Sequence, residues 1–151
     1  NMAAAKARID NISSNGKPAI FENWQEWLKL TDESLQAIYM IGIQRYEDGL
    51  FEEAKGVFLF LTRCNFSTFE PWFALGLADE ALQRYQEALY DYSVALVMQP
   101  ESPSCYLHSA ACYVQLGDSA NARAFLEIGQ ELEASWNDSD NKLFAQIKKY
   151  I

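Results

Sequence analysis

Few residues in this 151-residue chain are of the types that carry covalent or metal chemistry. It contains three cysteines, Cys64, Cys105 and Cys112, and a single histidine, His108. Cys105 and Cys112 lie seven residues apart on one predicted helix, but two thiols and one imidazole do not complete a zinc site with four ligands. His108 has no serine or cysteine nucleophile pattern beside it, and the adjacent Ser109 alone does not make one. We therefore predict buried thiols, a packed or partly exposed histidine, no catalytic residue and no metal site.

The composition restricts the possible partners. The formal net charge of −9 disfavours nucleic acid and anionic membranes, because both bind clusters of Lys and Arg. Apolar runs such as residues 57–61 fall well short of the ~18 residues that a membrane span requires, so we expect no membrane insertion. There is no glycine-rich phosphate loop, which predicts no cofactor of that kind. An odd number of cysteines without a C-x-x-C pair fits a reducing cytoplasm better than a disulfide framework.

The elements that must position these residues are helices that recur along the chain. One predicted helix carries Trp72, Leu75 and Gly76 on one face, and the next carries Tyr85, Ala88, Tyr92 and Ala95 before ending at Pro100. A polar break at Gln83 and Arg84 separates the two helices. Large and small residues at these spacings resemble a tetratricopeptide repeat, although Asp79 stands where that pattern favours tyrosine.

The same pattern recurs with a period of 34 residues. Five series step by 34 twice: Gly42, Gly76, Ala110; Ala54, Ala88, Ala122; Phe58, Tyr92, Leu126; Gly49, Gln83, Gly117; and Ile38, Trp72, Tyr106. Small residues are required where antiparallel helices cross closely, and large residues beside them fill the remaining space. We predict an all-α fold in which three helix-turn-helix repeats, at about 35–68, 69–102 and 103–136, form a concave superhelix.

The segments that flank the repeats are predicted to be helical. Residues 1–30 form an N-terminal helical segment, and residues 31–151 form the repeat domain with a C-terminal capping helix at 142–151. Within the N-terminal segment, residues 19–30 read as an amphipathic helix whose apolar stripe is Ile20, Trp24, Trp27 and Leu28. The open end of a repeat array exposes an apolar face. This helix therefore either covers the first repeat or joins a second copy of the chain in a homodimer.

A second apolar face runs along the leading helix of each repeat, away from the packing stripe. At helical spacing this face carries Gln36, Tyr39, Ile43 and Tyr46 in the first repeat, Glu70, Phe73, Leu77 and Glu80 in the second, and Ser104, Leu107, Ala111 and Val114 in the third. The predicted lining consists of Tyr39, Ile43, Tyr46, Phe73, Leu77, Leu107 and Ala111. A helix that is apolar on two faces is either fully buried or binds something. Two interpretations stay open: the end helices cover these positions as core, or the positions line a groove for an extended or helical peptide. The lack of Lys and Arg here disfavours a receptor for a terminal carboxylate.

Three stretches resemble a particular branch of tetratricopeptide proteins, the type III secretion chaperones that serve translocator proteins. They are residues 51–64, 72–78 and 106–112, the last being similar to a Pro-Phe-His-Ala-Ala-Glu-Cys segment of that family. The resemblance covers about residues 32–134. It implies three repeats, a bacterial cytoplasmic location, no cofactor and no catalysis. It also implies a concave groove that takes a short, extended apolar segment of the cargo.

The resemblance thus predicts a chaperone that keeps a secreted translocator soluble and competent for export. The alternative is an adaptor or regulatory scaffold that holds the gatekeeper of the secretion system, or another protein. Both would use the same groove, so both interpretations stay open.

Overall fold

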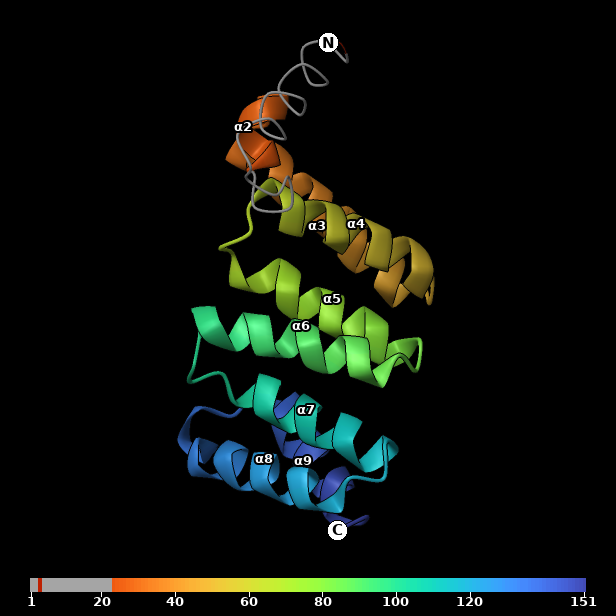
Figure 1. Ribbon diagram of the computed structural model, residues 1–151, viewed down its shortest axis with the longest axis vertical. Coiled ribbons are helices and arrows are strands. Elements are labelled where there is room, and N and C mark those ends of the chain that lie inside the picture. The colour runs from red at the N-terminus through yellow and green to blue at the C-terminus, as the bar shows by residue number, and fades with distance from the viewer. Residues whose placement is uncertain (1–2, 4–22) are drawn as a thin grey trace.

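The computed structural model describes Ala3 and residues 23–151, and all regular structure within this part of the chain is helical. The helices are α2 (Trp24–Leu28), α3 (Asp32–Glu47), α4 (Phe51–Cys64), α5 (Phe69–Ala81), α6 (Tyr85–Met98), α7 (Pro103–Gln115), α8 (Ser119–Glu131), a 3-10 turn η2 (Glu133–Ser135) and α9 (Asp138–Lys148). Helices α3 to α8 stack in chain order as three antiparallel pairs (Figure 1). The predicted all-α repeat fold is confirmed.

In the turn within each of the three helix pairs, the residue at the same repeat position has a left-handed backbone conformation. Gly49 has φ 77° and Gly117 has φ 75°, and the corresponding Gln83 has φ 61°. Glycine adopts this conformation without steric cost, whereas a residue with a Cβ pays for it. Side-chain caps fix other helix starts: the Thr31 hydroxyl accepts a hydrogen bond from the backbone N–H of Ser34 at 3.1 Å.

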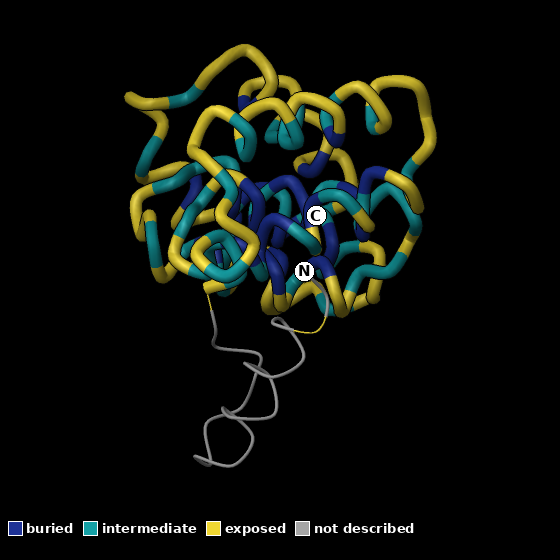
Figure 2. The backbone as a smooth tube through the Cα atoms, turned by 90° about the horizontal axis from the view of Figure 1, so that it is seen from above, coloured by how far each residue is buried: buried dark blue, intermediate teal, exposed yellow. Residues whose placement is uncertain are grey.

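Close packing between the paired helices depends on the small residues of the repeat. A Cβ added to Gly42 would lie 2.5 Å from a Phe58 ring carbon, and one added to Gly76 would lie 2.5 Å from the Tyr92 ring. Ala54, Ala88 and Ala122, which belong to the second helix of each pair, are completely buried. Buried residues accordingly run through the middle of the array, and exposed residues lie around it (Figure 2). The predicted pairing of small and large residues is confirmed.

A buried ionic cluster joins α4, α5 and α6. The Lys55 ammonium lies 2.6 Å from Asp79 Oδ1, and Asp79 is 2% exposed. Burial, together with the neighbouring Asp79 carboxylate, raises the pKa of Asp91 to about 9. Asp91 Oδ2 is buried and has no hydrogen-bond partner within the described residues. A proton on Asp91 removes that deficit, because the neutral acid can donate to Asp79.

The C-terminal helix α9 packs across α7 and lies behind α7 and α8 in the view of Figure 1. Its buried Ile147 joins Leu107, Ala110 and Leu126 in one apolar cluster. The helix begins earlier than predicted, at Asp138, because Asn137 and Asp140 form a reciprocal capping box. It ends at Lys148.

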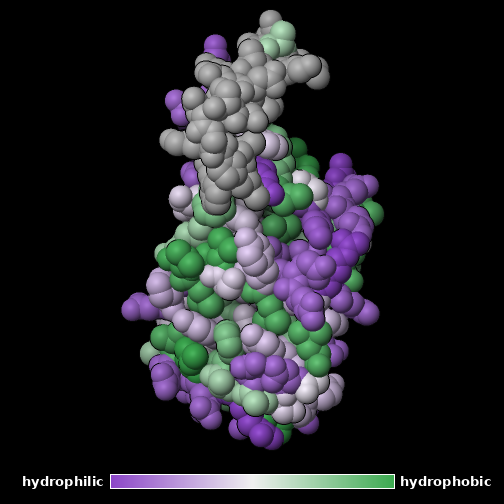
Figure 3. All heavy atoms as spheres, viewed as in Figure 1, coloured by the Kyte–Doolittle hydropathy of each residue, from purple (hydrophilic) through white to green (hydrophobic). Residues whose placement is uncertain are grey.

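At the other end, α2 is shorter than the predicted helix of residues 19–30. Lys29 adopts a left-handed conformation (φ 54°) and ends the helix after Leu28. Residues 19–22 lie outside the described residues. Within residues 23–151, no helix combines the length and apolar character needed to cross a membrane. The face drawn in Figure 3 carries hydrophobic residues as separate patches among hydrophilic ones.

Candidate peptide-binding groove

The predicted groove residues come together on one face of α3 and α5, and this face continues onto α7. Tyr39, Ile43, Tyr46, Phe73, Leu77 and Ala111 are all partly buried. Their inner sides contact the core: the ring centroids of Tyr39 and Phe58 are 5.9 Å apart, and those of Phe73 and Tyr92 are 5.8 Å apart. Their outer sides stay accessible, so this face is neither fully buried nor fully solvated.

A cavity of about 370 Å³ opens at the start of this face, between α3 and α5. It is lined by Asp32, Leu35, Gln36, Tyr39, Leu61, Asn65, Thr68, Glu70 and Pro71. Burial, and then the charge of Glu70, raise the pKa of Tyr39, so the phenol stays neutral. The cavity therefore combines apolar walls with carboxylates and a neutral hydroxyl.

The middle of the face holds a polar network centred on Glu80. Its carboxylate accepts a hydrogen bond from the Tyr92 hydroxyl at 3.0 Å, lies 3.1 Å from His108 Nδ1, and accepts a weak contact from the Cys112 thiol at 3.5 Å. The His108 ring meets Phe73 edge-on, with centroids 5.7 Å apart. His108 is thus a packed, partly exposed residue, as predicted, and it links α7 to α5.

Sequence analysis did not select Glu80 as a site residue. The one available signal was its place at helical spacing after Leu77, on the same face. Its partners lie 12, 28 and 32 residues away in the chain, and no local pattern reports such contacts.

The buried thiols are chemically inert at neutral pH. Burial raises the pKa of Cys64 to about 11, and burial, the largest of several influences, raises that of Cys105 to about 11. Burial and the Glu80 charge raise the pKa of Cys112 further. Protonated thiols are poor nucleophiles, so these residues act as small apolar packing groups, as predicted.

The third repeat differs from the prediction at Leu107. Leu107 is completely buried rather than exposed to a groove. It packs so closely on α8 that a Cβ on Gly129 would lie 2.8 Å from it, and it shares a cluster with Ile147 of α9. The assignment of Leu107 to the groove lining was therefore wrong, because α8 and α9 enclose this position.

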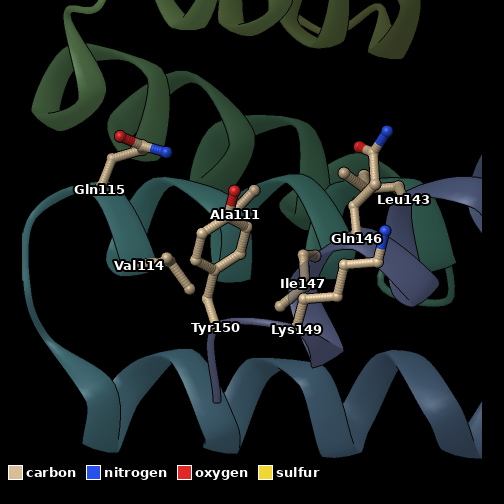
Figure 4. Close-up of a pocket in the computed structure, with 8 residues that line it drawn as sticks. All are labelled: Ala111, Val114, Gln115, Leu143, Gln146, Ile147, Lys149 and Tyr150. Carbon is tan, nitrogen blue, oxygen red and sulfur yellow. The ribbon is translucent and has the colours of Figure 1, made fainter.

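Ala111 lies on the groove side of α7, but the C-terminal residues cover its surroundings. A cavity of about 470 Å³ lies here between α7 and the end of the chain. Figure 4 shows Ala111 and Val114 of α7 around the same cavity as Ile147, Lys149 and Tyr150. The open part of the face is therefore made mainly by α3 and α5.

The residues predicted to cap the array or join a second copy lie on α2. Trp24 packs on α4, with its ring centroid 6.4 Å from that of Phe60, and Leu28 is 48% exposed. Trp27 is partly buried, and Ile20 lies outside the described residues. Ile41 of α3 stays half exposed at this end. The role of these residues in association stays a prediction.

The comparisons with known proteins point in one direction. No protein-family model matches the chain. The low calcium response locus protein H of Yersinia pestis is 31% identical over 108 residues, which is 70% of this chain and 63% of that protein. The match therefore spans less than two thirds of this curated relative.

Solved structures extend the similarity to the fold. The type III secretion chaperone SycD of Yersinia enterocolitica, in complex with a peptide of the translocator YopD, superposes with a TM-score of 0.73 at 26% identity. The alignment covers 80% of this chain and 92% of that one. A chain of the CopN–Scc3 complex superposes with a TM-score of 0.73 at 25% identity, covering 85% of this chain and 75% of that one. The resemblance predicted from the sequence is thus confirmed: the chain is similar in sequence and in fold to type III secretion translocator chaperones.

Proposed function

We propose that this protein is a chaperone of a bacterial type III secretion system that acts in the bacterial cytoplasm. It binds an extended apolar segment of a secreted translocator along α3 and α5 and keeps that cargo soluble and competent for export. The observation that carries the proposal is the set of apolar, partly exposed side chains of Tyr39, Ile43, Tyr46, Phe73 and Leu77 on one face of α3 and α5. The similarity to chaperones solved with the translocator YopD and with the chaperone-binding region of PopD supports it.

The face has the properties that such binding needs. Each apolar side chain that the cargo encloses contributes roughly 1.5–3 kcal/mol, so a few anchors account for useful affinity. The aromatic and aliphatic groups sit on helices whose other sides are fixed in the core, so little ordering is required on binding. Binding and release, without catalysis, are the whole proposed activity.

The direct test replaces two lining residues by aspartate. The double variant Tyr39→Asp with Leu77→Asp should lose the cargo, because cargo binding would desolvate carboxylates that have no partner. The matched control is Val97→Asp with Ile128→Asp, which adds the same charge at exposed positions of the trailing helices α6 and α8. Cargo is detected by co-purification from the native cell, and folding is checked by melting of the free variants. Cargo retained by the double variant would refute the proposed groove.

An adaptor that holds a gatekeeper or another protein of the secretion system is the second candidate. The similarity to a chain of the CopN–Scc3 complex favours it. Affinity capture from the native cell followed by identification of the bound protein separates the two candidates. A translocator supports the first, and a non-translocator partner supports the second.

A further inference from the structure

The cavity between α3 and α5 has the shape and chemistry of a pocket for one long side chain. Its volume of about 370 Å³ is near the lower end of the range for small-molecule sites. Leu35, Leu61 and Pro71 supply apolar wall, and the Tyr39 ring belongs to both this cavity and the proposed groove. A side chain that branches from a peptide lying in the groove would therefore enter the cavity directly.

Two carboxylates, and no cationic group, line this cavity. Asp32 and Glu70 are both exposed, and none of the nine lining residues is Lys, Arg or His. Asp32 Oδ1 accepts a hydrogen bond from the neutral Gln25 amide at 2.7 Å. Neither acid forms an ion pair within residues 23–151. Glu52 and Glu53, by contrast, pair with Arg84 and Arg45, whereas Glu33 and Glu127 resemble Glu70 in forming no ion pair within the described residues.

The negative charge of Glu70 reaches into the cavity. Glu70 and Tyr39 both line the cavity, and the Glu70 charge, after burial, raises the pKa of Tyr39. Farther along the face, Glu80 also presents a carboxylate, but that group is already bonded to Tyr92 and His108. The carboxylates of this face that have no tyrosine or histidine partner within the described residues therefore lie at the α3–α5 cavity.

We propose that this cavity takes a lysine or arginine side chain of the cargo segment, next to the apolar anchors that occupy the groove. The inference rests on the proposed function and specifies its cargo. The aliphatic stem of the basic side chain packs on Leu35, Leu61 and Pro71, while the charged head reaches the carboxylates of Asp32 and Glu70. An acidic side chain would be repelled here, so the cavity selects among otherwise similar apolar segments.

The pocket itself is tested with small probes on the full chain. Nα-acetyl-lysine methylamide and its uncharged analogue Nα-acetyl-norleucine methylamide are titrated while the amide NMR signals of Leu35, Tyr39 and Thr68 are followed. The lysine probe should bind about two- to fivefold more tightly than the norleucine probe, which corresponds to one exposed ion pair. Glu70→Gln should remove most of that difference, whereas Glu127→Gln on α8 should leave it unchanged. Equal binding of both probes to the natural chain would overturn the inference.

A second measurement separates this inference from the proposed function. Glu70→Lys should reduce co-purification of the cargo, and Tyr39→Asp with Leu77→Asp should abolish it. If Glu70→Lys binds cargo normally while the double variant does not, the groove stands and the basic-side-chain pocket is wrong. If both variants bind normally, the groove itself is wrong.

The chain's own N-terminal segment is the competing occupant, because its sequence contains Lys6, Arg8 and Lys17. Replacing these three residues by glutamine should leave the pocket signals unmoved in the absence of a probe. A shift of those signals would assign the pocket to the N-terminal segment and overturn the proposal.

Discussion

The second and third repeats place residues at the same positions of one 34-residue pattern and use them differently. Phe73 and Leu77 of the second repeat lie on a partly open face, whereas their counterparts Leu107 and Ala111 lie under α8 and α9. The difference arises outside the repeat, because α9 packs back on α7. A repeat position therefore determines toward which side of the array its side chain projects. The element that packs on that side determines whether the side chain becomes part of the core or stays accessible.

The largest expected effect tests the enclosed position directly. Leu107→Ala should lower the free energy of unfolding by about 2–5 kcal/mol, because it leaves a cavity among fully buried groups. Tyr39→Ala, at the same position of the first repeat, should cost clearly less, since that side chain is only partly buried. Urea unfolding of both variants measures the difference. Equal losses would mean that the first and third repeats are equally enclosed.

The next largest effect on stability is expected where the two helices of a pair pack closely. Gly76→Ala should destabilise the protein even though Ala110 occupies the same position in the third repeat, because the new methyl would meet the Tyr92 ring. Overpacking costs about 1–3 kcal/mol, partly offset by the ~1 kcal/mol gain in helix propensity.

The double variant Gly76→Ala with Tyr92→Leu copies the third repeat, where Leu126 follows Ala110. A double-mutant cycle should show that Gly76→Ala costs less in the Tyr92→Leu background than in the natural chain. No coupling would show that Tyr92 is not the group that limits residue 76.

The buried acid pair of the second repeat gives an effect on stability whose size depends on pH. Because the pKa of Asp91 rises from 3.8 to about 9 on folding, the folded state binds more protons between these values and loses stability as the pH rises. Asp91→Asn removes this loss, so its stability relative to the natural chain should rise by about 1.4 kcal/mol for each pH unit from pH 5 to pH 8. Urea unfolding at several pH values checks this, with Glu127→Gln as the control. An advantage that is independent of pH would contradict a neutral Asp91.

The smallest effect on stability is expected on the open face. Leu77→Asp should change the free energy of unfolding by about 0.5 kcal/mol or less, because water still reaches the side chain of the free protein. Cargo binding should nevertheless fall, so stability and binding separate at this position. Strong destabilisation by Leu77→Asp would place this face in the core, as in the third repeat.

The fold was predictable because its determinants are local and repeated. Gly42 and Phe58, like Gly76 and Tyr92, recur at fixed spacing, and each pair lies within one helical hairpin. The placement of Tyr39, Ile43, Tyr46, Phe73 and Leu77 on one partly exposed face followed from the same register, whereas Leu107 is buried. Its enclosure depends on Ile147, which lies 40 residues away and outside the period. The Glu80–His108 contact could not be predicted either, because it joins residues of two different repeats and no local sequence pattern indicates such a contact.

The capping helix α9 also limits how copies of this chain can assemble. Repeat arrays that expose an apolar face at both ends can associate head to tail and grow into filaments. Here Asn141, Lys142, Ala145 and Gln146 are exposed on α9, and Ile147 is turned inward, so α9 itself presents a largely polar outer surface. The half-exposed Ile41 lies at the opposite end. We therefore expect copies of the chain to associate through the end that carries α3 rather than through α9.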